Sequence, residues 1–371
     1  MVDVQRGTML QVRGAHSLSA GLAVVLLGLS VLTAVRPGVA TSASAPGPTQ
    51  AIVLTRTSII RVDVASSRIV TTRAVGPGSA RKVVHAGAFV ALQRQRAVEI
   101  LDPRTLDRLA AAEFSQDVRD VAAAGPLLFV AAGMDVHVLQ VGRDAQASPQ
   151  ARVRLPKPAD ALTARGSRLF VIDDLATPLY AHLIDVSRPK TPATTPITWT
   201  DTNAHLRAQA VADRWYVLVG YTTIQERGQY LVILPARPPL RELGRRVVAL
   251  ERKPVRPAAP VAHFVEEFRV HRRSVGQNPL LLGVARAGDQ VWLVSRSLDR
   301  EGAIIERQMP LGAIGEFPHE RRGAIELVGA RLFVAAPSTL LALDVDPPSA
   351  RITRFKTPTP ILSFAIAEPT R

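Results

Sequence analysis

Histidine and aspartate are the residues whose types and spacing in this sequence could support metal chemistry. His85, His137 and His182 each fall in a segment predicted to be a β-strand. Imidazole nitrogens gathered from several strands can bind a metal ion such as Zn²⁺. Isolated polar residues on strand faces explain the same pattern, so we expect neither a metal nor another cofactor. His85 is the weak candidate for a metal ligand, because its strand should be the innermost of its repeat.

Four aspartates recur at the ends of predicted strands: Asp63, Asp102, Asp185 and Asp344. A carboxylate after a strand accepts hydrogen bonds from backbone N–H groups of the following turn. A ring of carboxylates could also bind a cation. We interpret the recurrence as a turn feature, since a repeated residue is more simply explained by the repeated structure than by catalysis.

The densest basic cluster comprises four residues: Arg269, His271, Arg272 and Arg273. Arginine pairs bind carboxylate or phosphate groups in a bidentate manner. The cluster is therefore the sequence's candidate binding site for an anionic group. The alternative is a solvated helix with internal salt bridges, which Phe264 and Phe268 would pack against the fold.

Several catalytic motifs are absent from the sequence. It contains no Gly-x-Ser-x-Gly, no Gly-x-x-x-x-Gly-Lys, no Gly-x-Gly-x-x-Gly and no His-Glu-x-x-His. The usual signatures of serine hydrolases, phosphate-binding loops, dinucleotide sites and zinc proteases are thus missing. Without cysteine there is no disulfide, thiolate chemistry or cysteine-bound metal. These absences favour a protein that does not catalyse a reaction.

Composition describes a basic, apolar chain. Of 371 residues, 46 are Lys or Arg and 31 are Asp or Glu, which gives a net charge of +15, and 47% are apolar. An apolar fraction this high excludes a disordered chain. A positive field favours an anionic partner, either a protein or an anionic polymer. Codon usage in a GC-rich genome is the alternative explanation for the many arginines.

The N-terminal residues resemble a targeting signal. Arg6 and Arg13 precede an uncharged, mostly apolar stretch over 18–35, and small residues follow at Ala40, Ala43 and Ala45. This order is typical of a secretory signal peptide, cleaved after Ala40 or Ala43. The alternative is an uncleaved membrane anchor over 18–35. Either places the protein outside the cytoplasm, periplasmic or secreted, and makes nucleic acid a poor match as partner.

One short apolar phrase of the Leu-Phe-Val-Ala kind recurs seven times. Its second residue stands at positions 52, 89, 129, 170, 216, 292 and 333. All steps lie near 40 residues except the step of 76 between 216 and 292. Three other alternating apolar runs accompany the phrase in most repeats, bounded by Gly, Pro and Asp. Four short strands in about 40 residues predict an all-β chain folded as a β-propeller.

The chain ends and the long step define the expected organisation. The first repeat lacks its first strand, and Ile361–Ala367 supplies a strand with no phrase after it, so we expect this strand to close the ring. We favour seven blades with an insertion at about 251–280 over eight blades. Within that insertion, apolar residues at 261, 264, 265 and 268 have loosely helical spacing. The expected domains are 1–45, targeting segment and linker, and 46–371, the propeller, as a monomer.

The repeat resembles the secreted bacterial propellers of the LVIVD-repeat and YVTN-type superfamily. The nearest local match is Leu169-Phe-Val-Ile-Asp-Asp, followed by Leu183-Ile-Asp-Val-Ser-Arg-Pro. The resemblance implies a propeller fold and an extracytoplasmic setting, and it does not imply one activity. We therefore expect a non-catalytic binding or scaffold module. The alternative is a lactonase-like hydrolase with a metal held on the propeller axis.

Overall fold

The chain divides into two units, Met1–Ala45 and Pro46–Arg371. A computed structural model describes residues 50–76, 80–173, 180–198, 204–211, 214–222, 226–235, 246–254, 264–273, 277–287, 289–298, 303–313, 325–345 and 348–367. The predicted targeting segment lies outside these residues. Within them, no helix is long and apolar enough to cross a membrane.

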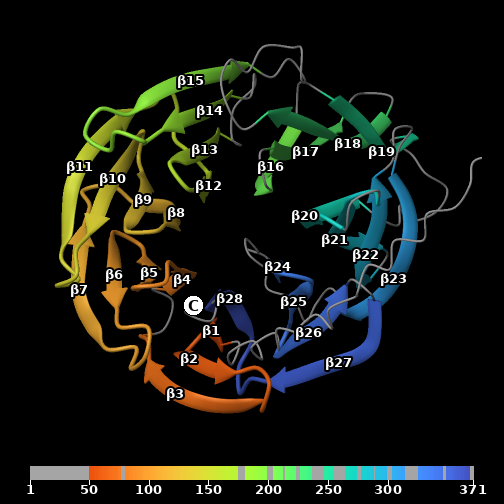
Figure 1. Ribbon diagram of the computed structural model, residues 1–371, viewed down its shortest axis with the longest axis horizontal. Helices are drawn as coiled ribbons and strands as arrows, with labels where there is room; N and C mark the ends of the chain where they lie inside the picture. The colour runs from red at the N-terminus through yellow and green to blue at the C-terminus, as the bar shows by residue number, and fades with distance from the viewer. Residues whose placement is uncertain are drawn as a thin grey trace, which may run out of the picture. The chain divides into compact units, whose positions relative to one another are not determined.

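The described part of Pro46–Arg371 consists of seven four-stranded sheets, which we number as blades 1–7 from the N-terminus (Figure 1). From the innermost strand outward, blade 1 contains β28 (Ile361–Ala367), β1 (Gln50–Thr55), β2 (Ser58–Asp63) and β3 (Arg68–Ala74). Blade 2 contains β4 (Ala80–His85), β5 (Val90–Arg94), β6 (Ala97–Leu101) and β7 (Arg108–Glu113). Blade 3 contains β8 (Val118–Ala124), β9 (Leu127–Ala132), β10 (Asp135–Val141) and β11 (Ala147–Arg154).

The remaining four blades repeat the same order. Blade 4 contains β12 (Ala161–Arg165), β13 (Arg168–Asp173), β14 (Tyr180–Asp185) and β15 (Ala193–Thr198). Blade 5 contains β16 (Ala204–Val211), β17 (Arg214–Thr222), β18 (Glu226–Pro235) and β19 (Arg246–Pro254). Blade 6 contains β20 (Phe264–His271), β21 (Leu280–Ala287), β22 (Gln290–Leu298) and β23 (Ala303–Ala313). Blade 7 contains β24 (Ile325–Val328), β25 (Arg331–Ala336), β26 (Thr339–Val345) and β27 (Pro348–Lys356).

The predicted seven-bladed propeller and its closing strand are both confirmed. In Figure 1 the first strand of each of blades 2–7 lies near the centre of the ring and the fourth lies at the rim. Blade 1 is completed from the other end of the chain, because β28 pairs antiparallel with β1, from Gln50 opposite Ala367 to Thr55 opposite Ile361. This pairing removes the open sheet edge that β1 would otherwise present to the axis.

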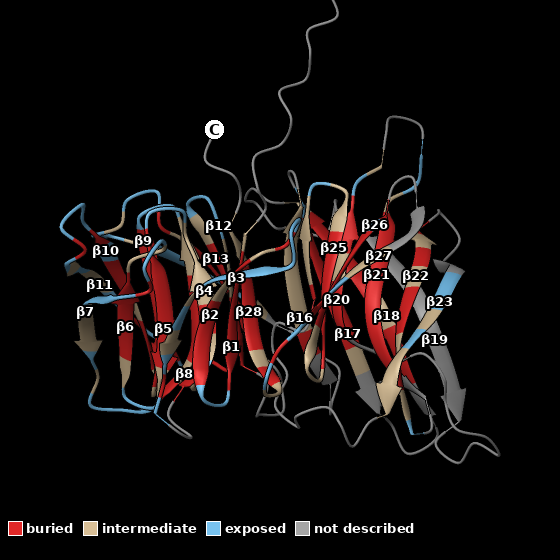
Figure 2. Ribbon diagram, turned by 90° about the horizontal axis from the view of Figure 1, so that it is seen from below, coloured by how far each residue is buried: buried red, intermediate tan, exposed pale blue. Residues whose placement is uncertain are grey.

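The recurring apolar phrase is the second strand of a blade, and the packing explains its composition. Successive residues of a strand point to opposite faces, and both faces of a blade are covered by neighbouring blades. On β9, Leu128 and Val130 pack in the cluster with blade 2, whereas Phe129 and Ala131 pack in the cluster with blade 4. Seven such clusters, one at each interface between blades, form the core. Figure 2 shows these buried residues along the strands, with exposed residues in the connecting turns.

Blade 6 departs from two expectations. Residues 264–271, predicted to lie in an insertion with helical spacing, form β20, the innermost strand of the blade. The phrase at Val291 belongs to β22, the third strand, and Leu280–Ala287 forms the second. The long step thus reflects a phrase assigned one strand too late and long strands within the step, such as the 10 residues of β18. Residues 255–263 and 274–276 of the expected insertion lie outside the described residues.

Candidate functional site

The innermost strands of all seven blades line a cavity of about 490 Å³ on the propeller axis. Each innermost strand is hydrogen-bonded to a neighbouring strand on one side only, so the N–H and C=O groups of its other edge face the axis without a strand partner. Such an edge must be covered or given polar partners. The seven edges therefore explain why the axis is polar although the interfaces between blades are apolar.

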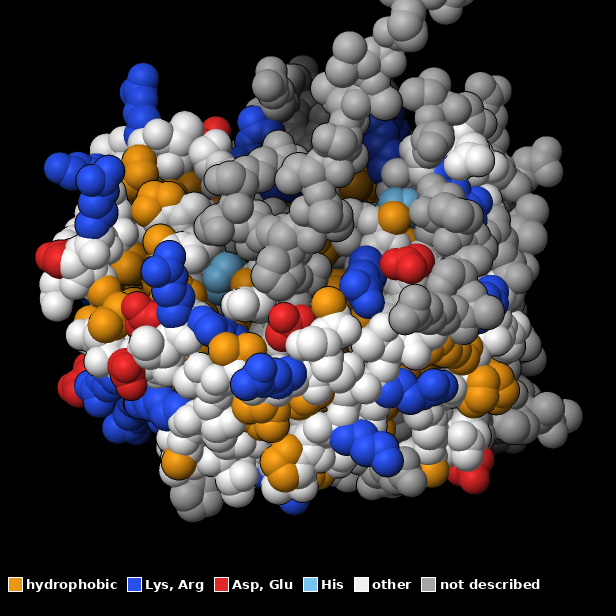
Figure 3. Space-filling model, turned by 60° about the horizontal axis from the view of Figure 1, so that its bottom comes forward, with side chains coloured by type: hydrophobic (Ala, Val, Ile, Leu, Met, Phe, Trp, Pro, Cys, Tyr) orange, Lys and Arg blue, Asp and Glu red, His pale blue; other side chains and the backbone are white. Residues whose placement is uncertain are grey.

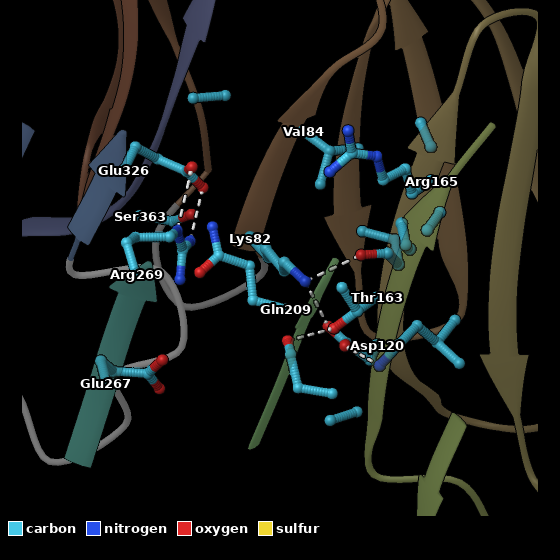
Figure 4. A pocket seen from close by; sticks show the side chains of 18 of the residues that line it. Lys82, Val84, Asp120, Thr163, Arg165, Gln209, Glu267, Arg269, Glu326 and Ser363 are labelled. Atoms are coloured by element: carbon cyan, nitrogen blue, oxygen red, sulfur yellow. Dashed lines mark hydrogen bonds and ion pairs between the residues drawn. The ribbon is translucent and has the colours of Figure 1, made fainter. Parts of the chain in front are cut away.

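Charged side chains of both signs line this cavity. The basic ones are Lys82, Arg165, Arg207 and Arg269, and the acidic ones are Asp120, Glu267 and Glu326. His85, Thr163, Gln209 and Ser363 add further polar groups. In Figure 4, Arg269, Glu326 and Glu267 lie on one side of the view and Asp120, Thr163 and Arg165 on the other. Most of these side chains connect one inner strand to the next.

Blades 2, 3 and 4 are joined through Asp120, whose side chain is 3% exposed. Lys82 Nζ lies 2.8 Å from Asp120 Oδ1 and donates to the Val121 carbonyl oxygen at 2.8 Å. The other carboxylate oxygen of Asp120 accepts the backbone N–H of Leu162 at 2.7 Å. One carboxylate thus fixes the register of β4, β8 and β12, with both oxygens occupied.

Blades 5, 6 and 7 are joined by two further ion pairs. Arg207 Nε lies 3.5 Å from Glu267 Oε1, and Arg269 Nη2 lies 2.9 Å from Glu326 Oε1. Burial by itself lowers the pKa of Arg269, but the carboxylate of Glu326 attracts its charge and accepts its hydrogen bonds, and the pKa is raised above its ordinary value. The Arg269 guanidinium therefore stays charged, and the pair holds β20 against β24.

Blades 4 and 5 are joined without a carboxylate. Thr163 Oγ1 donates to the Ala208 carbonyl oxygen at 3.0 Å, and Arg165 Nη1 donates to the Ala210 carbonyl oxygen at 2.6 Å. These two side chains cap the free edge of β16. Arg165 is exposed, and among the described residues it forms no ion pair within 4.0 Å.

The structure separates the members of the predicted basic cluster. Arg269 lines the axial cavity and is paired, as above, whereas His271 is buried at the end of β20. Arg272 is exposed. Arg273 lines a second cavity, of about 380 Å³, between blades 6 and 7, beside the buried side chains of Leu280 and Leu343. The four residues therefore do not form one anion-binding patch.

His85 occupies the position expected for it, at the end of the innermost strand of blade 2. It lines the axial cavity, and its Nδ1 accepts the backbone N–H of Gly87 at 3.4 Å. The structure does not bring His137 and His182 to the axis, since both lie on third strands. Among the described residues, no group of three or more His, Asp or Glu side chains is arranged to hold a metal ion.

The recurrent aspartates cap turns, as predicted, at three of the four positions. Asp63 Oδ1 accepts the N–H of Ala65 at 2.9 Å, and Asp185 Oδ1 accepts that of Ser187 at 2.8 Å. Asp102 Oδ1 accepts the N–H groups of Arg104 and Thr105. The bond from Thr105 is the main cause of a lowered pKa at Asp102. Asp344 instead lines the second cavity.

The sequence analysis did not identify most of the polar residues that line the axial cavity: Lys82, Asp120, Thr163, Arg165, Arg207, Gln209, Glu267 and Glu326. A usable signal was present, because their contacts join residues about one repeat apart. Lys82 and Asp120 are separated by 38 residues, and Arg165 and Ala210 by 45. Alignment of the first strands of successive repeats would have placed these polar residues side by side.

Comparisons with known proteins support the fold alone. Neither a known protein family nor a curated protein matches the sequence. A protein of Lactobacillus plantarum has a similar structure, with TM-score 0.58 and 14% identity over 86% of this chain and 99% of that one. Apo AztD of Citrobacter koseri has TM-score 0.51 and 10% identity over 86% and 97%. The dihydro-heme d1 dehydrogenase NirN has TM-score 0.51 and 14% identity over 87% and 66%. These proteins define the class, a seven-bladed β-propeller, and leave the LVIVD-repeat and YVTN-type resemblance a prediction.

Proposed function

We propose that this protein is a non-catalytic β-propeller binding module that acts outside the cytoplasm and binds an anionic partner. The observation that carries the proposal is the pairing of the carboxylates in the axial cavity with basic side chains. Asp120, Glu267 and Glu326 each pair with a Lys or Arg of a neighbouring blade. A carboxylate engaged in this way stabilises the fold and is a poor metal ligand or general base.

The distribution of basic side chains favours an extended anionic polymer as the partner. The chain has 15 more basic than acidic residues. Figure 3 shows Lys and Arg side chains scattered over the face drawn, between acidic and apolar ones. Scattered positive charge suits a long polyanion, which makes many weak contacts, better than a small acidic site on a protein. Binding of an acidic protein instead is one outcome of the test below.

Within the basic cluster, Arg272 and Arg273 are the residues that we propose for polymer contact. Both follow β20, and Arg272 is exposed. Arg269 is excluded from this role by its pairing with Glu326. A guanidinium on the surface can bind a sulfate, phosphate or carboxylate of the polymer with two parallel hydrogen bonds.

Fluorescence anisotropy with fluorescein-labelled dextran sulfate tests this proposal. We expect saturable binding that weakens as salt screens the charges. The double variant Arg272→Ser/Arg273→Ser should bind at least fivefold more weakly. Arg104→Ser/Arg188→Ser removes the same charge from two exposed positions in blades 2 and 4 and should change the affinity less than twofold. Equal weakening by both pairs would contradict a local site, and binding of acidic protein without dextran sulfate would assign a protein partner.

Metal analysis of the purified protein tests the non-catalytic part of the proposal. One retained equivalent of a divalent cation, together with lactone hydrolysis that a chelator abolishes, would overturn it in favour of the hydrolase alternative.

N-terminal sequencing of the protein from its native host tests the proposed location. A mature chain that begins near Thr41 or Ser44 supports secretion, and an intact stretch over 18–35 in the membrane fraction supports an anchored module.

A further inference from the structure

Arg165 differs from the other basic residues of the axial cavity. Its guanidinium has five N–H donors, and Nη1 donates to the Ala210 carbonyl oxygen. Lys82, Arg207 and Arg269 each pair with a carboxylate, but among the described residues Arg165 has no acidic partner. Because Arg165 is exposed, the remaining donors are accessible from solvent.

The balance of charge in the cavity defines the charge of a matching ligand. Among the described lining residues, three basic side chains pair with the three carboxylates, which leaves the positive charge of Arg165 unmatched. A carboxylate carries one negative charge and matches the planar guanidinium with two parallel hydrogen bonds. A phosphate monoester carries about −1.5 to −2 at neutral pH and would leave excess negative charge in the cavity. The cavity therefore fits a monocarboxylate better than a phosphate.

The surroundings of Arg165 define the rest of the ligand. Half-buried apolar residues from five other inner strands line the same cavity: Val84, Ala123, Ala210, Val328 and Ile366. A volume of about 490 Å³ lies within the range of small-molecule sites, roughly 300–1,000 Å³. The cavity thus combines apolar with charged side chains, and among the described lining residues Arg165 is the one cation without a carboxylate partner. Such a site is suited to an apolar body that carries a single anionic group.

We propose that the axial cavity binds a small organic monocarboxylate with an apolar body, and that Arg165 binds its carboxylate. This site goes beyond the proposed function, since it lies on the axis and does not involve Arg272 or Arg273. Polymer binding and monocarboxylate binding can therefore fail separately, and dextran sulfate anisotropy on the same samples distinguishes the two failures.

Dansylglycine is a suitable probe, because it joins an aromatic body to one carboxylate and its fluorescence rises in apolar surroundings. We expect one saturable site in the wild-type protein. Arg165→Met keeps an unbranched, flexible side chain and removes its charge, and it should weaken binding at least tenfold. Arg143→Met removes the same charge from an exposed turn of blade 3 and should leave the affinity unchanged. Dansylamide, which lacks the carboxylate, should bind both variants equally weakly.

Three results would overturn the proposal. One is the absence of saturable dansylglycine binding by folded wild-type protein. Another is equal weakening by Arg165→Met and Arg143→Met, which would show attraction by net charge alone. The third is displacement of dansylglycine by inorganic phosphate at lower concentration than by benzoate, which would assign the cavity to phosphate groups. Cooperative thermal unfolding of Arg165→Met, with a midpoint lowered by no more than about 4 °C through loss of the hydrogen bond to Ala210, confirms that the comparison concerns folded protein.

Discussion

The interfaces between blades and the axis that they surround are held together by different interactions. At the interface of blades 3 and 4, Phe129, Val171 and Ile184 are buried in an apolar cluster. At the axis the same two blades are joined by the Asp120 carboxylate and the N–H of Leu162. Second and third strands have both faces covered by other blades, so apolar side chains fill them. Innermost strands have a free backbone edge that no further strand can cover.

This difference assigns separate roles to the two regions. Apolar burial is proportional to area and has no preferred direction, so the interfaces supply stability without fixing how far one blade slides along another. Hydrogen bonds and ion pairs at the axis have narrow geometry and fix that register. Between blades 4 and 5 the register is fixed by neutral and cationic groups on backbone carbonyls, and this leaves Arg165 available for a ligand.

Removal of the closing strand should have the largest effect, because β28 belongs to both regions. Its Ile361 and Phe364 are 2% exposed, and its Ser363 Oγ accepts the Val83 N–H of blade 2 at 3.3 Å. Exposing the two apolar side chains alone costs about 3–6 kcal/mol, comparable with the whole net stability of many proteins. Deletion of 361–371 should therefore abolish soluble, cooperatively unfolding protein. Deletion of 368–371 is the control and should preserve the yield, as measured by size-exclusion chromatography and thermal unfolding.

Loss of Asp120 should have the next largest effect. Asp120→Ala leaves Lys82, whose side chain is 19% exposed, without its carboxylate and leaves the Leu162 N–H without its acceptor. Breaking a buried pair in this way costs about 3–5 kcal/mol. Urea unfolding followed by tryptophan fluorescence measures the change. Asp117→Ala removes an exposed carboxylate that pairs with Arg96 and should cause little change. If the two variants unfolded at the same urea concentration, the axial ion pairs would not stabilise the ring.

The sequence predicts the propeller better than it predicts the site. The physical reason is the difference between the apolar interfaces of the blades and the polar axis. Interface residues leave a strong local pattern, since two buried faces produce an unbroken apolar phrase every 40 residues or so. The phrase at Val291 misled the assignment because the third strand of blade 6 is as apolar as a second strand. Axial residues such as Lys82 and Asp120 follow no local sequence pattern, because each contacts a residue of the neighbouring blade. Arg269 was identified as part of a basic cluster, but its partner, Glu326, is 57 residues distant.

The pH dependence of the unfolding free energy tests whether water enters the interfaces between blades. Of the predicted changes in stability, this one should be the smallest. His182 is 5% exposed and pairs in register with Val171, on the face packed against blade 3. Burial lowers the pKa of His182 in the folded protein, so folding favours the neutral ring. Below the unfolded pKa of about 6.5 the unfolded state binds the proton more readily, and stability is lost as the pH falls.

Replacement of His182 isolates this contribution. His182→Leu keeps a similar volume and cannot bind a proton. The variant should lose less unfolding free energy than wild type between pH 7 and pH 5, as measured by urea unfolding at both values. His137→Leu is the matched comparison, since His137 is only half-buried. Burial lowers the pKa of His137, and the nearby Asp135 carboxylate partly opposes this lowering. Its effect on the pH dependence should therefore be smaller. If His137→Leu reduced the pH dependence of the unfolding free energy as much as His182→Leu or more, water would reach the interface of blades 3 and 4. The contrast between dry interfaces and a polar axis would then not hold there.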